Sequence, residues 1–424
     1  MRIFSALSLV FISLTMTAQH SFNSYFTDKV LRFDYMLAGN HEKTLVYPVG
    51  MKEEPFYGGS KTQLTDPFGY GNFRYELFDP ETGRIIYSRG FCTLFQEWQT
   101  TAEAKVMERS FYEVATMPFP RNKSGFVLSR RIEDGSFSKI YETLIDPDDY
   151  FIRKEKPAGV EATKIIYSGD PAVNVDLAFI AEGYTAAEMP KFREDVKRIS
   201  GILLSEAPFN EYRDKFNIWA VEAVSAESGT DIPGEGIYVS TILNSSFYTF
   251  DLDRYLTTLD IKTVNDLAAV VPHDNIIILI NSDRYGGGGV YNYYSCTTTD
   301  NPLSDHVFIH ELGHGFAGLA DEYYSSTVSY ENFYAFDVEP WEPNITTLVD
   351  FGSKWKNMIA GGTPVPTPAN AGYRGKVGVF EGAGYSARGI YRPQMECTMK
   401  SSTPSGFCAV CRKAVREMIE FYIK

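Results

Sequence analysis

The stretch HELGHGFAGLADEY, His310 to Tyr323, largely determines how this sequence is interpreted. Its two histidines stand four residues apart, so on a helix both imidazoles face the same side and can share one metal ion. Glu311 directly follows the first histidine, which puts its carboxylate beside an attacking water rather than on the metal. The spacing therefore predicts a metal centre with His310 and His314 as ligands and Glu311 as the catalytic base.

A catalytic zinc ion also needs a third protein ligand and an open coordination position. Gly318 can turn the chain back after the helix, and Asp321 follows it as an oxygen ligand. The arrangement imitates the HExxHxxGxxH pattern, with Asp in place of the third His and one extra residue before the glycine. Asp321 is therefore the predicted third ligand, and the alternatives that stay open are Glu322, Glu331 and Glu339.

The surroundings of the motif separate it from a chance match, which arises in roughly one protein in a hundred of this length. Three of the six histidines fall between His306 and His314, and the flanking residues are apolar or small. His306 is expected to be a satisfied polar residue at the helix start. Met399, in CTMKSS, is predicted to form a soft hydrophobic floor beneath the metal, and the alternative is that it fills an ordinary gap in the core.

Outside the motif, the chain divides into two regions near residue 160. Residues 19–160 are rich in Tyr and Phe and show short alternating segments, so they predict an all-β, sandwich-like domain. Two hairpins stand out: FRYELF and RIIYSRGF around DPETG, and a second with its turn at residues 133–135. A stretch dense in charge and proline, 146–170, suits a linker.

Residues 161–424 predict an α/β catalytic domain, since strand-like and helix-like segments alternate. Strands are expected at 175–181, 216–224 and 275–281, and helices after Thr185, at 264–271 and at the C-terminus. The unbroken apolar run in 275–281 is typical of a strand covered on both faces.

The net charge and the N-terminal residues of the chain are also informative. A formal charge of −14 and a pI near 5.0 argue against nucleic acid or an anionic membrane as partner. Residues 1–18 combine Arg2, an apolar run and small residues, which predicts a signal peptide and an exported chain without membrane insertion.

Five cysteines are present, three of them between Cys397 and Cys411. The CxxC spacing of Cys408 and Cys411 is compatible with a local structural disulfide, a redox pair or half of a zinc site. A local disulfide is the favoured interpretation, with free buried thiols as the alternative.

Several ordered blocks give the chain a resemblance to the IgA-peptidase family of bacterial zinc metallo-endopeptidases. They include VDLAFIAEGYTAAEMPKF, ILINSDRYGGGGVYN, HELGHGFAGLADEY, VFEGAGYSARGIYRP and CTMKSSTPSGFCAVCRKA. The resemblance implies a metzincin-like catalytic domain after a β-rich N-terminal domain, one catalytic Zn²⁺, and cleavage of a protein or peptide substrate.

Within these blocks, two sets of residues are candidates for contact with a substrate. Tyr285, Gly286 and Gly287 could accept the substrate backbone as an added strand, because glycines permit close approach. Tyr385 and Tyr391 are candidate hydroxyl donors to a tetrahedral oxyanion. Two other functions stay open: a zinc amidase acting on cell-wall peptides, and a non-catalytic protein that binds glycans or proteins.

Overall fold

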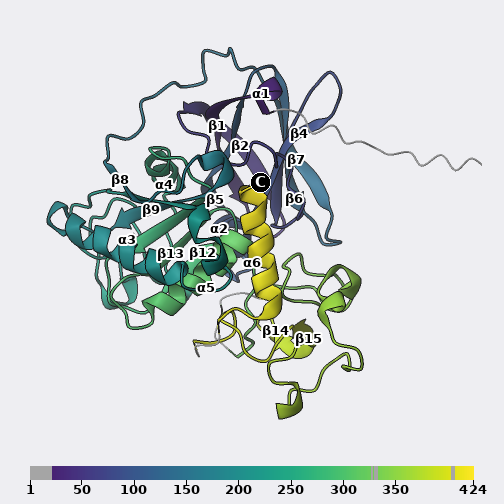
Figure 1. The fold of residues 1–424 in the computed structure, drawn as a ribbon. Helices are drawn as coiled ribbons and strands as arrows, with labels where there is room; N and C mark the ends of the chain where they lie inside the picture. The colour runs from purple at the N-terminus through teal and green to yellow at the C-terminus, as the bar shows by residue number, and fades with distance from the viewer. Residues whose placement is uncertain (1–21, 326–327, 329–332, 403–405) are drawn as a thin grey trace, which may run out of the picture.

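The structure, a computed structural model, describes residues 22–325, 328, 333–402 and 406–424. The predicted signal peptide, 1–18, lies outside these described residues. Figure 1 shows a β-rich N-terminal region followed by a region of mixed helices and strands. This is the order of fold types that the sequence predicts.

Two antiparallel sheets build the N-terminal region, with strand orders β2-β1-β5 and β4-β3-β6-β7. Their strands are β1 (Phe26–Gly39), β2 (Thr44–Glu54), β3 (Phe73–Phe78), β4 (Ile85–Phe91), β5 (Arg109–Pro120), β6 (Ser124–Arg131) and β7 (Phe137–Ile145). Aromatic residues fill the space between the sheets: the rings of Phe33 in β1 and Phe126 in β6 are fully buried, with centroids 5.0 Å apart. Aromatic side chains bury large areas, so this packing holds the two sheets together.

Both predicted hairpins of this region are confirmed. Strand β3 pairs with β4, and β6 pairs with β7, each in antiparallel register. The region is not all-β, however, because it also contains the short helices α1 (Phe22–Tyr25) and α2 (Leu94–Gln99). Thr93 caps α2 by accepting a hydrogen bond from the Gln96 amide, which satisfies a donor that the first helical turn leaves unpaired.

A six-stranded sheet of order β12-β13-β11-β9-β10-β8 forms the centre of the second region. Its strands are β8 (Ala162–Ile166), β9 (Val175–Glu182), β10 (Phe216–Val221), β11 (Asn275–Ile280), β12 (Gly287–Val290) and β13 (Tyr294–Thr298). The four inner strands run parallel, and β8 and β12 are antiparallel edges. Every residue of β9 and β11 is buried, which explains the unbroken apolar run of β11.

Four longer helices accompany this sheet: α3 (Met189–Leu203), α4 (Ile261–Ala268), α5 (Ser304–Ala317) and α6 (Ala409–Tyr422). The capping box of Thr185 and Glu188 precedes α3 as predicted. Helix α4 begins three residues before the predicted start, because the Asp260 side chain caps it by accepting from the Thr263 amide. A last hairpin, β14 (Phe380–Ala383) with β15 (Ser386–Arg392), lies between α5 and α6.

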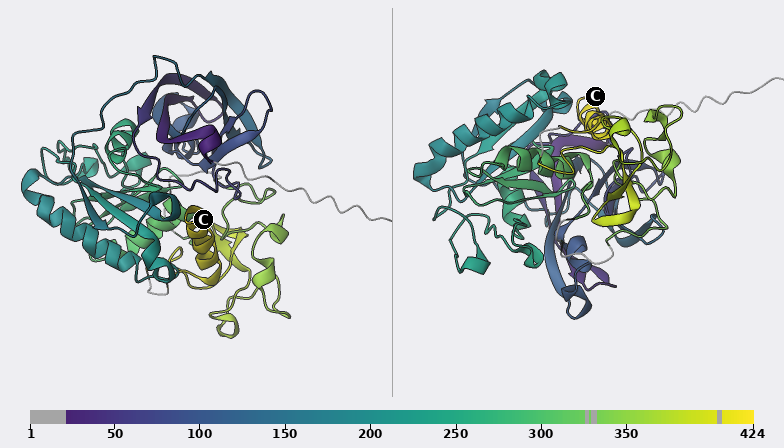
Figure 2. Two further views of the ribbon diagram at one scale, coloured as in Figure 1. Left: turned by 45° about the horizontal axis from the view of Figure 1, so that its top comes forward. Right: turned by 90° about the horizontal axis from the view of Figure 1, so that it is seen from below.

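The C-terminal helix α6 joins the two regions. In the views of Figures 1 and 2 it lies between the β-rich region and the β14-β15 hairpin. Phe421 packs against Phe68 with ring centroids 5.5 Å apart, and the Arg89 guanidinium lies 4.6 Å from the Phe421 ring centroid. Ser60 also donates a hydrogen bond to the backbone oxygen of Lys424 at 2.7 Å. The N-terminal region is therefore packed against the rest of the chain.

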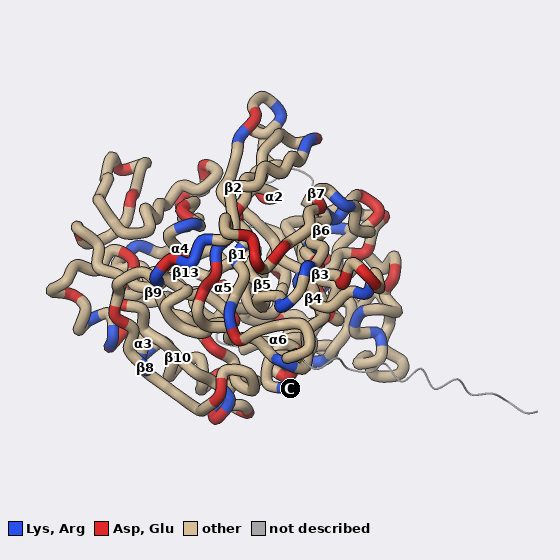
Figure 3. The backbone as a smooth tube through the Cα atoms, turned by 90° about the horizontal axis from the view of Figure 1, so that it is seen from above, with Lys and Arg blue, Asp and Glu red and all other residues tan. Residues whose placement is uncertain are grey.

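The surface carries charges of both signs. In the view of Figure 3, acidic and basic residues are interspersed along the backbone rather than gathered in one segment. Among the residues that the structure describes, no helix is both long and apolar enough to cross a membrane. The division of the chain at residue 160 stays a prediction; residues 146–161 contain no helix or strand.

Candidate metal centre and active-site cavity

Helix α5 carries HELGH and presents both histidines on one face. Phe308 and Leu312 are buried on its other side, so packing fixes the helix and points the imidazoles into a cavity. The Nδ1 atom of His310 lies 3.1 Å from the Thr398 carbonyl oxygen, and that of His314 lies 2.6 Å from the Leu319 oxygen. Because a carbonyl oxygen only accepts, each Nδ1 carries the proton and each Nε2 keeps its lone pair for a metal.

Asp321 completes a group of three ligand atoms. Helix α5 ends at Gly318, whose left-handed conformation (φ 62°) turns the chain back as predicted. Asp321 Oδ1 then lies 3.0 Å from His310 Nε2 and 3.4 Å from His314 Nε2, and the two Nε2 atoms are 3.1 Å apart. Tetrahedral zinc, with bonds of about 2.0 to 2.1 Å, separates its ligand atoms by about 3.3 to 3.4 Å. The geometry and chemistry of the three donors fit that ion.

Of the other candidates for third ligand, Glu322 and Glu339 do not belong to this group. Glu322 points away from it, and its Oε1 accepts a hydrogen bond from Asn344 Nδ2 at 3.1 Å. Glu339 accepts hydrogen bonds from the Asp350 amide and the Thr347 hydroxyl. Glu331 lies outside the described residues. His306 lies at the start of α5 and lines the cavity, but it is not part of the three-ligand group.

The electrostatics of the group reflect its burial and its mixed charges. Burial alone would raise the pKa of Asp321, but His314 and His310 together hold it well below its ordinary value. Burial also opposes protonation of His314, yet Asp321 and Glu311 raise its pKa to about 9. The pKa of Glu311 is raised, chiefly by burial. A raised pKa makes this carboxylate a stronger base, as proton abstraction from water requires.

One of the two tyrosines predicted to stabilise an oxyanion lies at the group. Tyr385 stands in the turn between β14 and β15 with φ 64°, and its hydroxyl donates to Asp321 Oδ2 at 2.6 Å. This bond fixes the orientation of the Asp321 carboxylate, so that its Oδ1 atom faces the two histidines. Tyr391, on strand β15, is not among the residues that line the cavity. Its backbone pairs with Thr346, and an oxyanion role for its hydroxyl stays a prediction.

The cavity in front of the three ligands has a volume of ≈ 440 Å³. Tyr285, Arg254 and Tyr323 line it, and so do Gln96 and Glu97 of helix α2. Tyr255 donates its hydroxyl hydrogen bond to Glu97 Oε2 at 2.5 Å, across the two regions of the chain. The N-terminal region thus forms part of the cavity wall. Helix α2 carries no motif, so nothing local in the sequence indicated this contribution.

The glycines after Tyr285 line the cavity and also pack closely against neighbouring segments, and their contact with a substrate stays a prediction. A Cβ on Gly287 would lie 2.6 Å from Val307 Cγ1, and one on Gly289 would lie 2.2 Å from the Glu311 carbonyl oxygen. These glycines let edge strand β12 pack directly on helix α5. The backbone of Tyr255 also bridges to Gly287, so the chain itself covers part of the edge expected to receive a substrate. Gly286 is equally enclosed, since a Cβ there would lie 2.7 Å from the Arg254 oxygen.

Met399 lies beneath helix α5, as the sequence predicts. It is fully buried in a turn closed by a hydrogen bond from the Lys400 amide to the Cys397 oxygen, 2.9 Å long. Its sulfur lies 2.7 Å from the position of a Cβ on Gly313, the residue before His314. The absence of a side chain at Gly313 therefore lets Met399 support the helix between its two histidines.

The predicted local disulfide is wrong. All five cysteines are free and buried, and Cys408 and Cys411 are separate thiols on the first turn of α6. Cys408 is the N-cap residue of that helix, and its sulfur accepts a hydrogen bond from the Cys411 amide.

Comparisons with known proteins place the chain among sequence families. The sequence model of the family described as IgA Peptidase M64 matches residues 163–372 and 369–419. A second model, described as Peptidase M64 N-terminus, matches residues 21–142. No curated protein matches the chain.

Proposed function

Because the chain belongs to the IgA peptidase M64 family, we propose that it is an exported, zinc-dependent endopeptidase whose active site is the cavity at HELGH. Membership of the family indicates a peptidase, a hydrolase that acts on protein or peptide substrates. The single observation that carries the finer proposal is the convergence of His310, His314 and Asp321 beside Glu311, inside a cavity.

The three ligands would hold the zinc ion through His310 Nε2, His314 Nε2 and Asp321 Oδ1. A zinc ion bound there polarises the scissile carbonyl and makes water a usable nucleophile at neutral pH. The chain supports these ligands from behind, since Thr398 and Leu319 fix the two imidazoles and Tyr385 fixes the carboxylate. Such outer contacts orient the ligands and set their basicity.

Glu311 carries the proton transfers. It follows His310 on the same helix and lines the cavity, so its carboxylate can take a proton from the attacking water. The same group can then return that proton to the leaving amine, which would otherwise depart as an unstable anion. Tyr285 also lines the cavity and is a candidate hydroxyl donor to a developing oxyanion, whereas the hydroxyls of Tyr323 and Tyr385 bond to Asp321.

Two finer features belong to the same proposal. The turn after α5 and the buried Met399 under the helix support a metzincin-like catalytic domain. Export of the mature chain rests on the sequence of residues 1–18 alone.

The proposal is tested by offering the zinc-loaded mature chain two sets of substrates in parallel. One set contains unmodified peptides of ten or more residues, and the other contains peptides joined to cell-wall sugar. We expect internal cleavage of the unmodified peptides and its loss when the metal is removed. Cleavage restricted to the sugar–peptide amide would instead identify a cell-wall amidase, and binding without cleavage of either set would contradict catalysis.

A further inference from the structure

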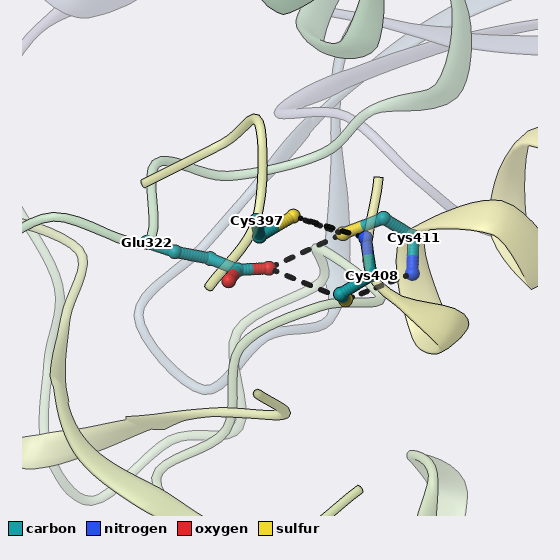
Figure 4. Close-up of side chains that lie close together, drawn as sticks. All are labelled: Glu322, Cys397, Cys408 and Cys411. Carbon is teal, nitrogen blue, oxygen red and sulfur yellow. Dashed lines mark hydrogen bonds between the residues drawn. The ribbon is translucent and has the colours of Figure 1, made fainter. Parts of the chain in front are cut away.

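A second cluster of metal-binding side chains lies behind the active site. Cys397, Cys408, Cys411 and Glu322 are all buried, and each offers one ligand atom within 4.8 Å of the others. Figure 4 shows the three sulfur atoms and the carboxylate of Glu322 turned toward a common centre. The residues come from three separate segments of the chain. We propose that this cluster is a structural zinc site, distinct from the catalytic one.

The distances within the cluster match a tetrahedral ion. Zinc–sulfur bonds of about 2.3 Å place two sulfur ligands about 3.8 Å apart, and the sulfur atoms of Cys397 and Cys411 are 3.7 Å apart. Glu322 Oε1 lies 3.2 Å from the Cys411 sulfur and 3.9 Å from the Cys408 sulfur. A mixed zinc–oxygen and zinc–sulfur pair requires about 3.5 Å, the middle of that range.

Backbone amide groups around the cluster donate hydrogen bonds to the cysteine sulfur atoms, which stabilises the thiolate form. The Cys408 amide donates to the Cys397 sulfur at 3.3 Å, and the Cys411 amide donates to the Cys408 sulfur at 3.5 Å. Cys408 and Cys411 also lie at the N-terminus of α6, where the helix dipole favours negative charge. The backbone therefore supplies the outer hydrogen bonds that zinc thiolates use.

If the cluster were only part of a packed apolar core, the burial of the Glu322 carboxylate would be unexplained. Its side chain is completely buried, and Oε2 has no hydrogen-bond partner among the described residues. Burying a carboxylate costs several kcal/mol unless a cation or hydrogen bonds compensate for the lost water. Asn344 holds the Glu322 Oε1 atom at 3.1 Å, yet it cannot neutralise the charge. A divalent cation at the centre of the cluster supplies that neutralisation.

The cluster is connected to the active site through backbone that both share. Asp321 faces the two histidines while Glu322, the next residue, faces the sulfur atoms. The Glu322 amide donates to the Met399 oxygen at 2.8 Å, and the Thr398 oxygen receives the hydrogen bond of His310. An ion in the cysteine cluster thus clamps residues 321–322 to residues 397–399. It positions Asp321, Met399 and the Thr398 carbonyl for the catalytic site.

The first experiment counts metal in the mature chain after incubation with Zn²⁺ and removal of loosely bound ions. We expect two zinc equivalents in the wild type and one in the double variant His310→Ala, His314→Ala. Replacing Zn²⁺ with Co²⁺ in that double variant should give the near-ultraviolet charge-transfer absorption of cobalt bound to thiolate. This readout requires neither enzymatic activity nor an altered cysteine.

Two further variants assign the second ion. Cys411→Ser should lose one equivalent and the thiolate absorption, whereas Cys296→Ala, which removes a buried thiol outside the cluster, should keep both ions. A single equivalent in the wild type, with none in the histidine double variant, would overturn the proposal. A mass lower by two hydrogens, with Cys397 linked to Cys411, would overturn it as well, because a disulfide would then be the native state.

Discussion

The two clusters of candidate ligands differ in their access to solvent, although they share adjacent residues of the chain. The side chains of His310 and His314 are 14% and 17% exposed and face a cavity, whereas Glu322 and Cys411 are completely buried. The first cluster offers three ligands and the second offers four. An ion with three protein ligands and an open side can work on a substrate, while one with four ligands in the core can only hold the chain together.

This difference also concerns the ligand atoms. Zinc bound by imidazole and carboxylate ligands with an open position remains a strong Lewis acid. Zinc bound by three cysteine sulfur atoms and a fourth ligand has no open position, and its effect is to stabilise the fold. Asp321 and Glu322 are neighbours with similar side chains, yet each serves a different cluster. Backbone direction, rather than side-chain chemistry, therefore decides which of the two faces the cavity.

The largest expected effect comes from a chelator that competes at the open cluster. Treating the chain with a mild chelator should remove one ion and abolish peptide cleavage, because the cavity gives the chelator access to that ion. The thiolate-bound ion should remain, and adding Zn²⁺ should restore cleavage. Metal content and cleavage rate measured on the same samples check this, and simultaneous loss of both ions would contradict the distinction between an open and a closed site.

Glu311→Gln should lower kcat/KM by about two to four orders of magnitude, the usual contribution of a general base. Both zinc equivalents should be retained, since Glu311 belongs to neither group of ligands. Steady-state kinetics on one cleaved peptide, together with the metal count, checks this prediction. Loss of zinc in this variant would mean that Glu311 is a ligand.

Tyr385→Phe should lower zinc affinity at the open cluster, or kcat/KM, by about 10-fold to 100-fold, as loss of an outer hydrogen bond to a ligand does. The reason is that the variant removes the 2.6 Å hydrogen bond to Asp321. Tyr391→Phe is the matched control and should be close to wild type, since Tyr391 does not line the cavity. Equal effects of the two variants would contradict the role given to Tyr385.

The smallest effect concerns the packing that supports the open cluster. Gly289→Ala should lower the free energy of unfolding by about 1 to 3 kcal/mol, because its Cβ would lie 2.2 Å from the Glu311 oxygen. In Gly201→Ala, on helix α3, the new methyl group meets nothing within 4 Å, so a gain of up to about 1 kcal/mol is expected. Denaturant unfolding of both variants measures the difference, and an unaffected Gly289→Ala protein would contradict the tight packing of β12 on α5.

Features of the site that depend on neighbouring residues in the chain could be predicted from the sequence. The four-residue spacing of His310 and His314 is fixed by the helix itself, and Gly318 turns the chain just after that helix. The same holds for the hairpins and for the buried strand β11, whose patterns are local. The position of Met399 beneath the helix was likewise predicted from the local segment CTMKSS.

Features that depend on distant parts of the chain could not be predicted in this way. The cysteine cluster needs Glu322 together with three cysteines more than seventy residues later in the chain, so CxxC alone suggested a local disulfide instead. Tyr385 and Tyr391 looked equivalent in the sequence, but only Tyr385 stands in the turn of the β14-β15 hairpin that faces Asp321. The contribution of Glu97 to the cavity depends on how the two regions pack together.

The most direct test of the central claim is to digest a library of protein-derived peptides with the wild type and with Glu311→Gln. Both proteins should carry the same zinc content, and mass spectrometry should identify the new termini. We predict internal cuts with the wild type and almost none with Glu311→Gln, which would establish an endopeptidase that uses Glu311 as its base. Equal cleavage by the two proteins, or no cleavage by the zinc-loaded wild type, would contradict that claim.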